Sequence, residues 1–358
     1  LLAEEEAARE DQRRKDSQEV IETCSLLLNH WQPYFEHFNE NLSITYGDQI
    51  DSEDQRELED DGRPVVNRNI ILPKVLQYLG SSIKRRRSVA AFPVDNSGDD
   101  AIAQKLTKIF KHTEQDNDLE SVSLEVRASA VVTKMGWYYI PPPPVGAEGD
   151  DLLVKVYSEA PENILLDADA RDLDQRSWKR IGRRSWLSLE DIEGLYPEYI
   201  DEVKEKISLG EKSWNSLGER VKQGARPDSS MSRSQGSGSS WTDSGGVSHG
   251  ATSLTFKSSD VVDRVNNLFL VLELWERKVR VDPVSRKKET YMLLRIALPY
   301  LDICLGRYEL PLKYYPFVLY QQINFGSTII DTASYVDQLR PVQEEKNRIA
   351  SKAEDAAS

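Results

Sequence analysis

The sequence predicts an α+β fold, and three features of the chain support that class. Apolar residues recur every three to four positions through most of the first 134 residues, which is the period of amphipathic helices. Residues 268–320 instead carry apolar runs typical of strands joined as a meander. A helical pattern returns from Ser334. Helices that precede such a meander favour a sheet covered by those helices.

The first predicted element is a helix over residues 3–46. Charged residues three and four apart support its first half, and Cys24 and Trp31 belong to a packed face further along. Pro33 predicts a break or kink, because proline lacks the amide hydrogen and crowds the preceding turn. Residues 48–61 hold eight carboxylates and one base, and we interpret this acidic stretch as a solvated surface segment.

Three further helices are predicted before the first strand. Asn67 is expected to cap a helix that runs to Arg87 and ends in a basic run. Helices near 99–115 and 119–134 follow. The second is expected to stop at Gly136, because glycine adopts the left-handed conformation that closes many helices.

Strands and turns dominate the next part of the chain. The predicted strands are 137–140 with 151–157 as its hairpin partner, then 163–166 and 177–187, followed by two short helices within 188–208. Residues 218–259 are rich in serine and glycine, so we expect a mobile insertion there. The meander then has four predicted strands, at 268–277, 291–298, 301–309 and 314–320.

Composition limits the possible functions. The chain has 358 residues, which suits about two domains. Sixty acidic residues against 46 basic ones give a net charge of -14. This charge argues against a protein that binds nucleic acid tightly and recognises its base sequence. Cys24 and Cys304 form no metal-binding or disulfide pattern, and no apolar run reaches the ~18 residues of a membrane span. The chain starts without methionine and stops within a helical pattern, so we expect a segment of a longer polypeptide.

Candidate catalytic and metal sites are weak, and no cofactor is indicated. The histidines lack metal-binding spacing, and no phosphate-binding glycine loop or catalytic triad is present. Divalent cations need converging oxygens, and the best candidate cluster contains Glu162, Asp167, Asp169, Asp172 and Asp174. Its register does not match an EF-hand, so we favour a polar turn. A metal-dependent nucleic-acid enzyme that uses these carboxylates stays an alternative.

A series of short motifs follows along most of the chain. They are Tyr46-Gly47-Asp48-Gln49, Gly62-Arg63-Pro64 before Asn67, Phe92-Pro93-Val94, Gly136-Trp137, Ala160-Pro161-Glu162-Asn163, Asp172-Leu173-Asp174, Tyr196-Pro197, Tyr315-Pro316-Phe317-Val318, and Gln343, Asn347 and Ser351 on the last helix. In this order they resemble the portal (head-to-tail connector) proteins of tailed bacteriophages, most closely the short-tailed type. The insertion at 218–259, and Ile50 where an aromatic residue is usual, depart from that pattern.

The resemblance implies a domain organisation. Residues 1–60 would form an N-terminal helical arm and acidic segment, and residues 61–330 an α+β wing domain with the insertion at 218–259. Residues 331–358 would form the first helix of the portal stem. The clip, second stem helix, channel helix and crown that follow in the family are expected to be missing from this segment.

The resemblance also implies a function without covalent chemistry. The family forms a ring of about twelve identical subunits at one capsid vertex. Double-stranded DNA passes through the ring non-specifically, driven by the terminase large subunit, and is later ejected. The ring nucleates capsid assembly with the major capsid protein and scaffold, and it docks tail adaptor proteins. We therefore expect a virion protein assembled in the host cytoplasm, with no membrane partner. A generic virion scaffold or adaptor is a second alternative, which the native mass would distinguish.

A ring of identical subunits needs two different, complementary surfaces on each subunit. We predict that the acidic stretch, including Asp48, Asp60 and Asp61, contacts the basic run of a neighbouring subunit, which consists of Lys84, Arg85, Arg86 and Arg87. The last helix has both polar and apolar faces, which suits a helix wedged between neighbours. Its predicted packing residues are Leu339, Val342, Gln343, Asn347 and Ile349.

Overall fold

The computed structural model describes residues 2–50, 52–60, 62, 67–84, 89–93, 100–143, 153–170, 173–208, 262–263, 268–281, 286, 288–322, 329 and 332–355. The chain separates into two compact units. Unit 1 comprises Leu1–Leu26, Arg184–Glu273 and Leu294–Tyr308, and unit 2 comprises Leu27–Arg183, Leu274–Leu293 and Glu309–Ser358. The predicted insertion at 218–259 lies outside the described residues. The mixture of helices and sheets confirms the α+β class.

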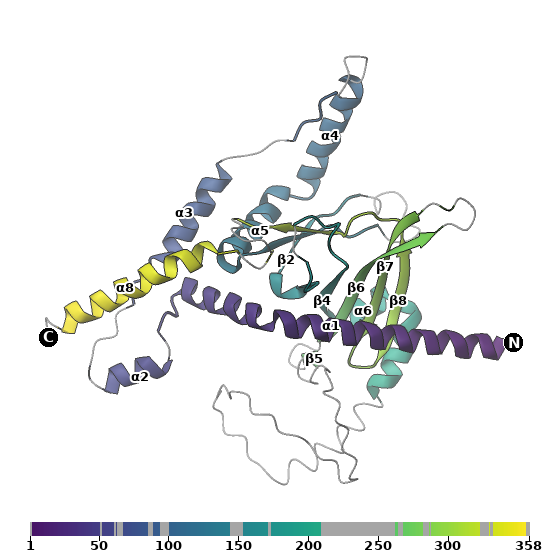
Figure 1. Ribbon diagram of the computed structural model, residues 1–358, viewed down its shortest axis with the longest axis horizontal. Helices are drawn as coiled ribbons and strands as arrows, with labels where there is room; N and C mark the ends of the chain where they lie inside the picture. Colours follow the sequence, from purple (N-terminus) through teal and green to yellow (C-terminus); the bar gives the residue numbers. More distant parts are fainter. Residues whose placement is uncertain are drawn as a thin grey trace, which may run out of the picture. The chain divides into compact units, whose positions relative to one another are not determined.

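Helix α1 (Leu2–Tyr46) continues past Pro33, so the predicted break is wrong (Figure 1). Trp31, Phe35 and Phe38 are buried on either side of the proline and hold the helix in place. Pro33 and Asn29 are both exposed, so water can hydrate the Asn29 carbonyl that proline leaves without a hydrogen bond. Packing therefore overrides the local preference of proline.

Buried charges fix the first half of α1 within unit 1. Asp16 is almost fully buried and accepts hydrogen bonds from Arg295 (Nη1–Oδ1 3.4 Å) and Arg307 (Nη1–Oδ2 3.0 Å). The Ser17 hydroxyl donates to the Asp302 carboxylate at 2.8 Å. Because removal of one partner would leave a buried charge uncompensated, this network specifies how α1 lies on its strands.

The larger sheet has the strand order β3-β4-β6-β7-β8, with β5 paired to β6. Its strands are β3 (Ile164–Leu166), β4 (Arg180–Ser188), β5 (Val262–Asp263), β6 (Leu268–Val281), β7 (Lys288–Leu298) and β8 (Ile303–Leu310). The predicted strands 163–166 and 177–187 and the first three strands of the meander are thereby confirmed.

The two short helices predicted after β4 are also present. Helix α6 (Leu189–Leu195) begins with a reciprocal cap, in which the Asp191 amide donates to the Ser188 hydroxyl and the Ser188 amide donates to the Asp191 carboxylate. The Ser188 hydroxyl also donates to Asp191 Oδ2 at 2.6 Å, and this hydrogen bond, together with that from the Ser188 amide, lowers the pKa of Asp191. A 3-10 turn (Pro197–Tyr199) and helical residues 200–208 follow.

A second sheet, in unit 2, has the strand order β2-β1-β9. Strand β1 (Gly136–Tyr139) pairs antiparallel with β2 (Tyr157–Glu159), so the predicted hairpin partner 151–157 is placed too early in the chain. β1 also pairs antiparallel with β9 (Phe317–Tyr320), so the prediction that residues 314–320 close the meander is wrong. The reason is aromatic packing, because the Phe317 ring stacks on Tyr139 with 5.0 Å between centroids.

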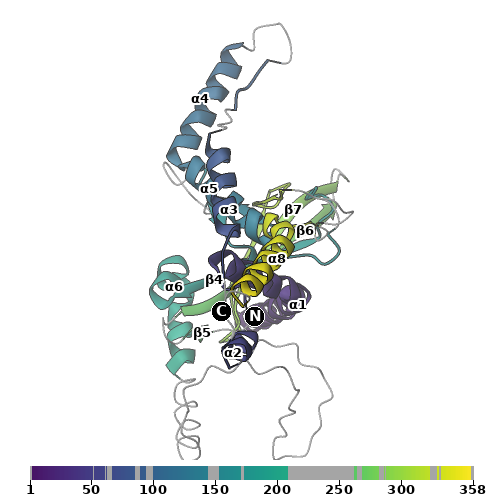
Figure 2. The same ribbon diagram turned by 90° about the vertical axis from the view of Figure 1, so that its left-hand side faces the viewer.

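Most helices belong to unit 2: α2 (Ser52–Asp60), α3 (Ile71–Ile83), α4 (Asp100–Asp116), α5 (Leu119–Thr133) and α8 (Tyr335–Asp355). Helices α3, α5 and α8 share a core cluster formed by Ile71, Val75, Val131, Val132 and Val336. Helix α4 extends beyond this group in both views (Figures 1 and 2). No helix in the described ranges has the length and apolar run needed to cross a membrane.

Helix α3 starts later than predicted, and a different asparagine caps it. The side-chain oxygen of Asn69 accepts hydrogen bonds from the amides of Ile71 (2.9 Å) and Leu72 (3.2 Å). Asn67, the predicted cap, instead donates from its side chain to the Gly47 carbonyl. Both asparagines stand close to the helix start, so residue type alone could not decide between them.

Helix α5 closes at Lys134 and not at the predicted glycine. Lys134 has a φ of 77°, and its amide donates to the Ala130 carbonyl at 3.1 Å. Gly136 begins β1, where an added Cβ would lie 2.1 Å from the Val126 carbonyl oxygen. Glycine is therefore required at 136 because β1 approaches α5 closely, and not because it terminates the helix.

Candidate subunit interface

The start of α8 is fixed by the carboxylate of Asp337. The Asp337 amide donates to the Ser334 hydroxyl (2.9 Å), and the Ser334 amide donates to Asp337 Oδ2 (2.8 Å). His37 and Asn41 contact Oδ1 at 2.8 and 2.9 Å, and Lys134 Nζ lies 3.4 Å from Oδ2. Burial raises the pKa of this carboxyl, but hydrogen bonds from Asn41 and Ser334 and the charge of Lys134 lower it overall.

Gln343 and Asn347, which we predicted to pack in the stem, are buried within their own subunit. Gln343 Oε1 accepts from the Ile70 amide (2.8 Å), and its Nε2 donates to the Arg68 carbonyl (2.9 Å). Asn347 Oδ1 accepts from the Arg68 amide (3.2 Å), and its Nδ2 donates to Gln49 Oε1 (2.8 Å). The two amides bind the extended segment before α3, much as a neighbouring strand would. Their role toward another subunit stays a prediction.

The five predicted packing residues of α8 lie on two sides of the helix. Leu339 packs against the core cluster of α3, α5 and α8, on the same side as the buried amides. Val342 and Ile349 lie seven residues apart, and each is 56% exposed. Of the five, only these two present apolar surface that another molecule could cover.

Helix α4 exposes a stripe of apolar side chains, which we call the α4 stripe. Its members follow one helical face and are 41% to 58% exposed: Ile102, Leu106, Ile109 and Phe110. The neighbouring face is covered, because the Ala91 amide donates to the Thr107 hydroxyl at 2.9 Å. Contiguous apolar patches on soluble proteins commonly mark interaction sites. The α4 stripe is therefore a candidate contact surface, and the sequence analysis predicted the helix but not its exposure.

The predicted charge pairing between subunits is described only in part. Asp48, Asp60 and Lys84 are exposed, and none of them has an ion-pair partner within the ranges that the structure covers. Asp61 and the run Arg85, Arg86 and Arg87 lie outside the described residues. The exposed charges are available to a neighbour, and the pairing itself stays a prediction.

The aspartates considered for a metal ion have separate surroundings. Asp167 is buried, Asp169 pairs with Lys179 at 2.8 Å, and Asp174 accepts a hydrogen bond from the Arg176 amide at 2.9 Å. Asp172 lies outside the described residues. Among the residues described, no group of three or more histidine, cysteine or carboxylate side chains could hold a metal ion. The geometry gives the metal-dependent enzyme alternative no support.

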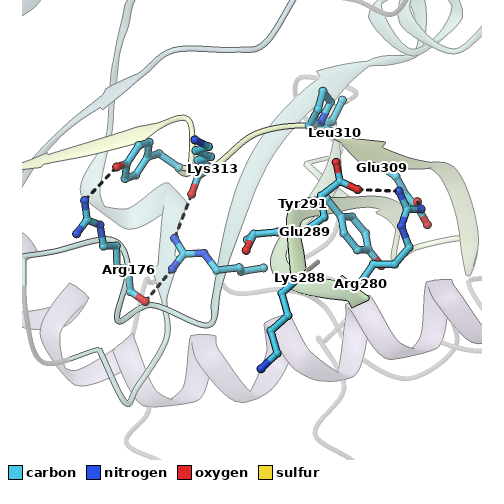
Figure 3. A pocket seen from close by; sticks show the side chains of 12 residues that line it. Arg176, Arg280, Lys288, Glu289, Tyr291, Glu309, Leu310 and Lys313 are labelled. Carbon is cyan, nitrogen blue, oxygen red and sulfur yellow. Dashed lines mark hydrogen bonds and ion pairs between the residues drawn. The ribbon is translucent and has the colours of Figure 1, made fainter. Parts of the chain in front are cut away.

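Sequence reasoning missed a basic cleft in unit 2, which Figure 3 shows from close by. Its cationic lining consists of Arg176, Arg277, Arg280, Lys288 and Lys313. These residues come from three segments that are far apart in sequence, so no basic run reveals the cleft. The one available signal is that several bases lie in and next to the connection between the predicted strands 268–277 and 291–298.

A comparison with protein families gives a match that covers most of the chain. The model of the phage P22-like portal protein family matches residues 27–358, from the second part of α1 to the end of the sequence. No curated protein matches the chain. The family match confirms the resemblance to short-tailed-phage portals that the ordered motifs predicted. The chain therefore belongs to the phage P22-like portal protein family.

Proposed function

We propose that the protein is a subunit of a portal ring at one vertex of a phage capsid. Double-stranded DNA would be packaged through this ring by a terminase and later ejected through it. The family match over residues 27–358 is the observation that carries the proposal. A ring of about twelve subunits, nucleation of capsid assembly and docking of tail adaptors are parts of the same proposal.

Ring closure requires that one surface of each subunit contact a different surface of the next. Groups of unit 2 supply candidates for both. The α4 stripe and the pair Val342 and Ile349 are apolar, whereas the acidic stretch 48–61 and the basic run 84–87 carry opposite charges. Burial of the apolar groups would supply most of the free energy of association, and the charges would fix the relative orientation of the subunits.

The net charge of -14 suits a conduit for DNA. Each phosphate that a protein neutralises adds affinity through counterion release, and tight binding would slow a moving duplex. An acidic ring lets DNA pass with little affinity. The proposal contains no covalent step for this chain, because the terminase would supply the work of packaging.

The native mass of the protein, together with electron microscopy of the same sample, tests the proposal. We expect rings of about a dozen subunits with a central hole. The double variant Ile109→Ser/Phe110→Ser should shift the population from rings to smaller species. A matched control, Leu173→Ser/Leu195→Ser, removes two exposed apolar side chains outside α4 and should leave the rings intact. A protein that remains monomeric at every concentration would refute the ring.

The charge pairing has its own test. Reversing the charges of Lys84, Arg85, Arg86 and Arg87 should make the rings dissociate at lower salt than the wild-type rings, because exposed ion pairs are screened by salt. Rings of unchanged stability in a salt titration would contradict this charge pairing but not the proposal of a ring.

A further inference from the structure

The basic cleft has a volume of about 600 Å³, within the range of about 300–1,000 Å³ that is usual for ligand pockets. Its walls are the outer ends of β6 and β7, the last two residues of β8, Pro311, Lys313 and Tyr314 after β8, and Arg176. Five cations and two carboxylates, Glu289 and Glu309, give the lining an excess of three positive charges. A chain with a net charge of -14 has thus concentrated positive charge at one place.

Both lining carboxylates are directed at the same cation. The Arg280 guanidinium lies 3.5 Å from Glu289 Oε2 and 3.5 Å from Glu309 Oε2, and it lies over the Tyr291 ring at 5.5 Å (Figure 3). The two carboxylates more than offset the charge of Arg280, so this group of three carries one net negative charge. The other four cations are therefore left without a carboxylate from the lining.

Arg277 is oriented by carbonyl groups and not by carboxylates. Its Nη1 donates to the Arg176 carbonyl at 2.7 Å and its Nη2 to the Gln175 carbonyl at 2.9 Å, while the guanidinium lies over the Tyr315 ring. Carbonyl oxygens satisfy hydrogen bonds without cancelling the positive charge, so the field of Arg277 persists in the cleft.

The other three cations are exposed to solvent. Arg176 donates to the Tyr314 hydroxyl at 3.3 Å. This hydrogen bond and the positive charge of Arg176 lower the pKa of Tyr314, because they favour its ionised form. Asp174 lies 4.0 Å from Arg176 and offsets part of its charge. Lys288 and Lys313 are exposed, and neither has an ion-pair partner in the described part of the chain.

We infer that this cleft binds an acidic peptide segment of a partner protein. Carboxylates of the segment would contact Lys288, Lys313 and Arg176, and the charge of Arg277 would add to their attraction. The half-exposed Tyr314 ring and Leu310 would pack against the aliphatic parts of the segment. The inference concerns a binding site in the isolated subunit, so it does not depend on ring formation.

An acidic peptide suits the cleft better than nucleic acid does. About three neutralised phosphates give only weak, salt-sensitive binding, and the charge of -14 repels a long polyanion. A duplex, whose major groove alone is about 12 Å wide, is too large for a cleft of this volume. A short segment with two or three carboxylates matches both the size and the excess charge.

The test measures binding of a fluorescent hexaglutamate peptide to the protein by anisotropy, with hexaglutamine as the uncharged control. We expect hexaglutamate to bind, hexaglutamine not to bind, and Lys288→Glu/Lys313→Glu to weaken binding by about tenfold or more, roughly 1.4 kcal/mol. The matched variant Lys108→Glu/Lys111→Glu reverses two exposed lysines on α4 and should stay within about twofold of the wild type.

Competition distinguishes the ligand classes. A six-residue single-stranded oligodeoxynucleotide and inorganic phosphate should each displace the labelled peptide only at concentrations well above that of unlabelled hexaglutamate. Stronger displacement by the oligonucleotide would identify a nucleic-acid site and overturn the inference. Equal weakening by both lysine pairs would also overturn it, because binding would then follow net charge and not the cleft.

Discussion

Helix α4 and the group formed by α3, α5 and α8 belong to the same unit and carry the same kind of amphipathic pattern, yet the group buries a shared apolar core whereas the α4 stripe is exposed. Ile71 on α3 is fully buried, whereas Ile109 on α4 is 58% exposed. The difference shows that helical periodicity predicts which face is apolar but not which molecule covers that face. In a protein of an oligomeric family, the uncovered face is where a second molecule is expected.

The largest effect that sharpens this comparison is expected from Ile71→Ala. The substitution leaves a cavity in the core cluster, so the free energy of unfolding should fall by about 2–5 kcal/mol. Ile109→Ala removes the same atoms from the exposed stripe and should change it by less than about 0.5 kcal/mol. Urea unfolding of dissociated subunits measures both. Equal losses would mean that α4 is covered within the subunit, and the comparison would fail.

A smaller loss is expected from Gln343→Leu, on the covered side of α8. Leucine keeps the volume but leaves the Ile70 amide and the Arg68 carbonyl without their partner, at a cost of about 1–3 kcal/mol. Val342→Ala, one residue away on the exposed side, should cost less than about 0.5 kcal/mol in the same urea titration. If the two variants unfold alike, the amide does not hold the segment before α3.

The smallest effect concerns pH and the anchor at Asp337. Because the folded state lowers the pKa of this carboxyl, its contribution to stability is complete above the unfolded value of about 3.9 and is lost as the pH falls through the folded value. Asp337→Asn removes this titration, although His37 and Lys134 still face position 337. The difference in unfolding free energy between wild type and variant should therefore shrink as the pH falls below about 4. A difference that stays constant down to about pH 2 would show that the charge of Asp337 is not involved.

Much of the secondary structure could be predicted because it follows from local patterns. Helices α4 and α5 and strands β3, β4, β6, β7 and β8 lie close to their predicted ranges. The errors fall where distant contacts decide the outcome. Pro33 does not break α1 because buried aromatic side chains surround it, and β9 leaves the meander because Phe317 stacks on a residue of β1. Neither contact is visible in the local sequence.

The candidate interface was less predictable than the fold. The two faces of α8 were expected, but sequence could not tell that Gln343 and Asn347 bind their own chain while Val342 and Ile349 remain exposed. The basic cleft was missed because its cations, such as Arg176 and Arg277, meet only after folding. The amino-acid composition shows the sign of the total charge, but only the structure shows where the charges gather.

Lys134 combines an unfavourable backbone conformation with an ion pair that connects two helices. Its left-handed backbone is unfavourable for a residue with a side chain by about 1–2 kcal/mol, and glycine would adopt it freely. Glycine, however, has no ammonium group to place 3.4 Å from the Asp337 carboxylate. The strained end of α5 therefore serves as the attachment point for the start of α8. Substitution of Lys134 by glycine would remove the backbone strain at the end of α5, but it would also remove the ion pair that holds the start of α8. Substitutions at these two helix ends are therefore expected to be coupled.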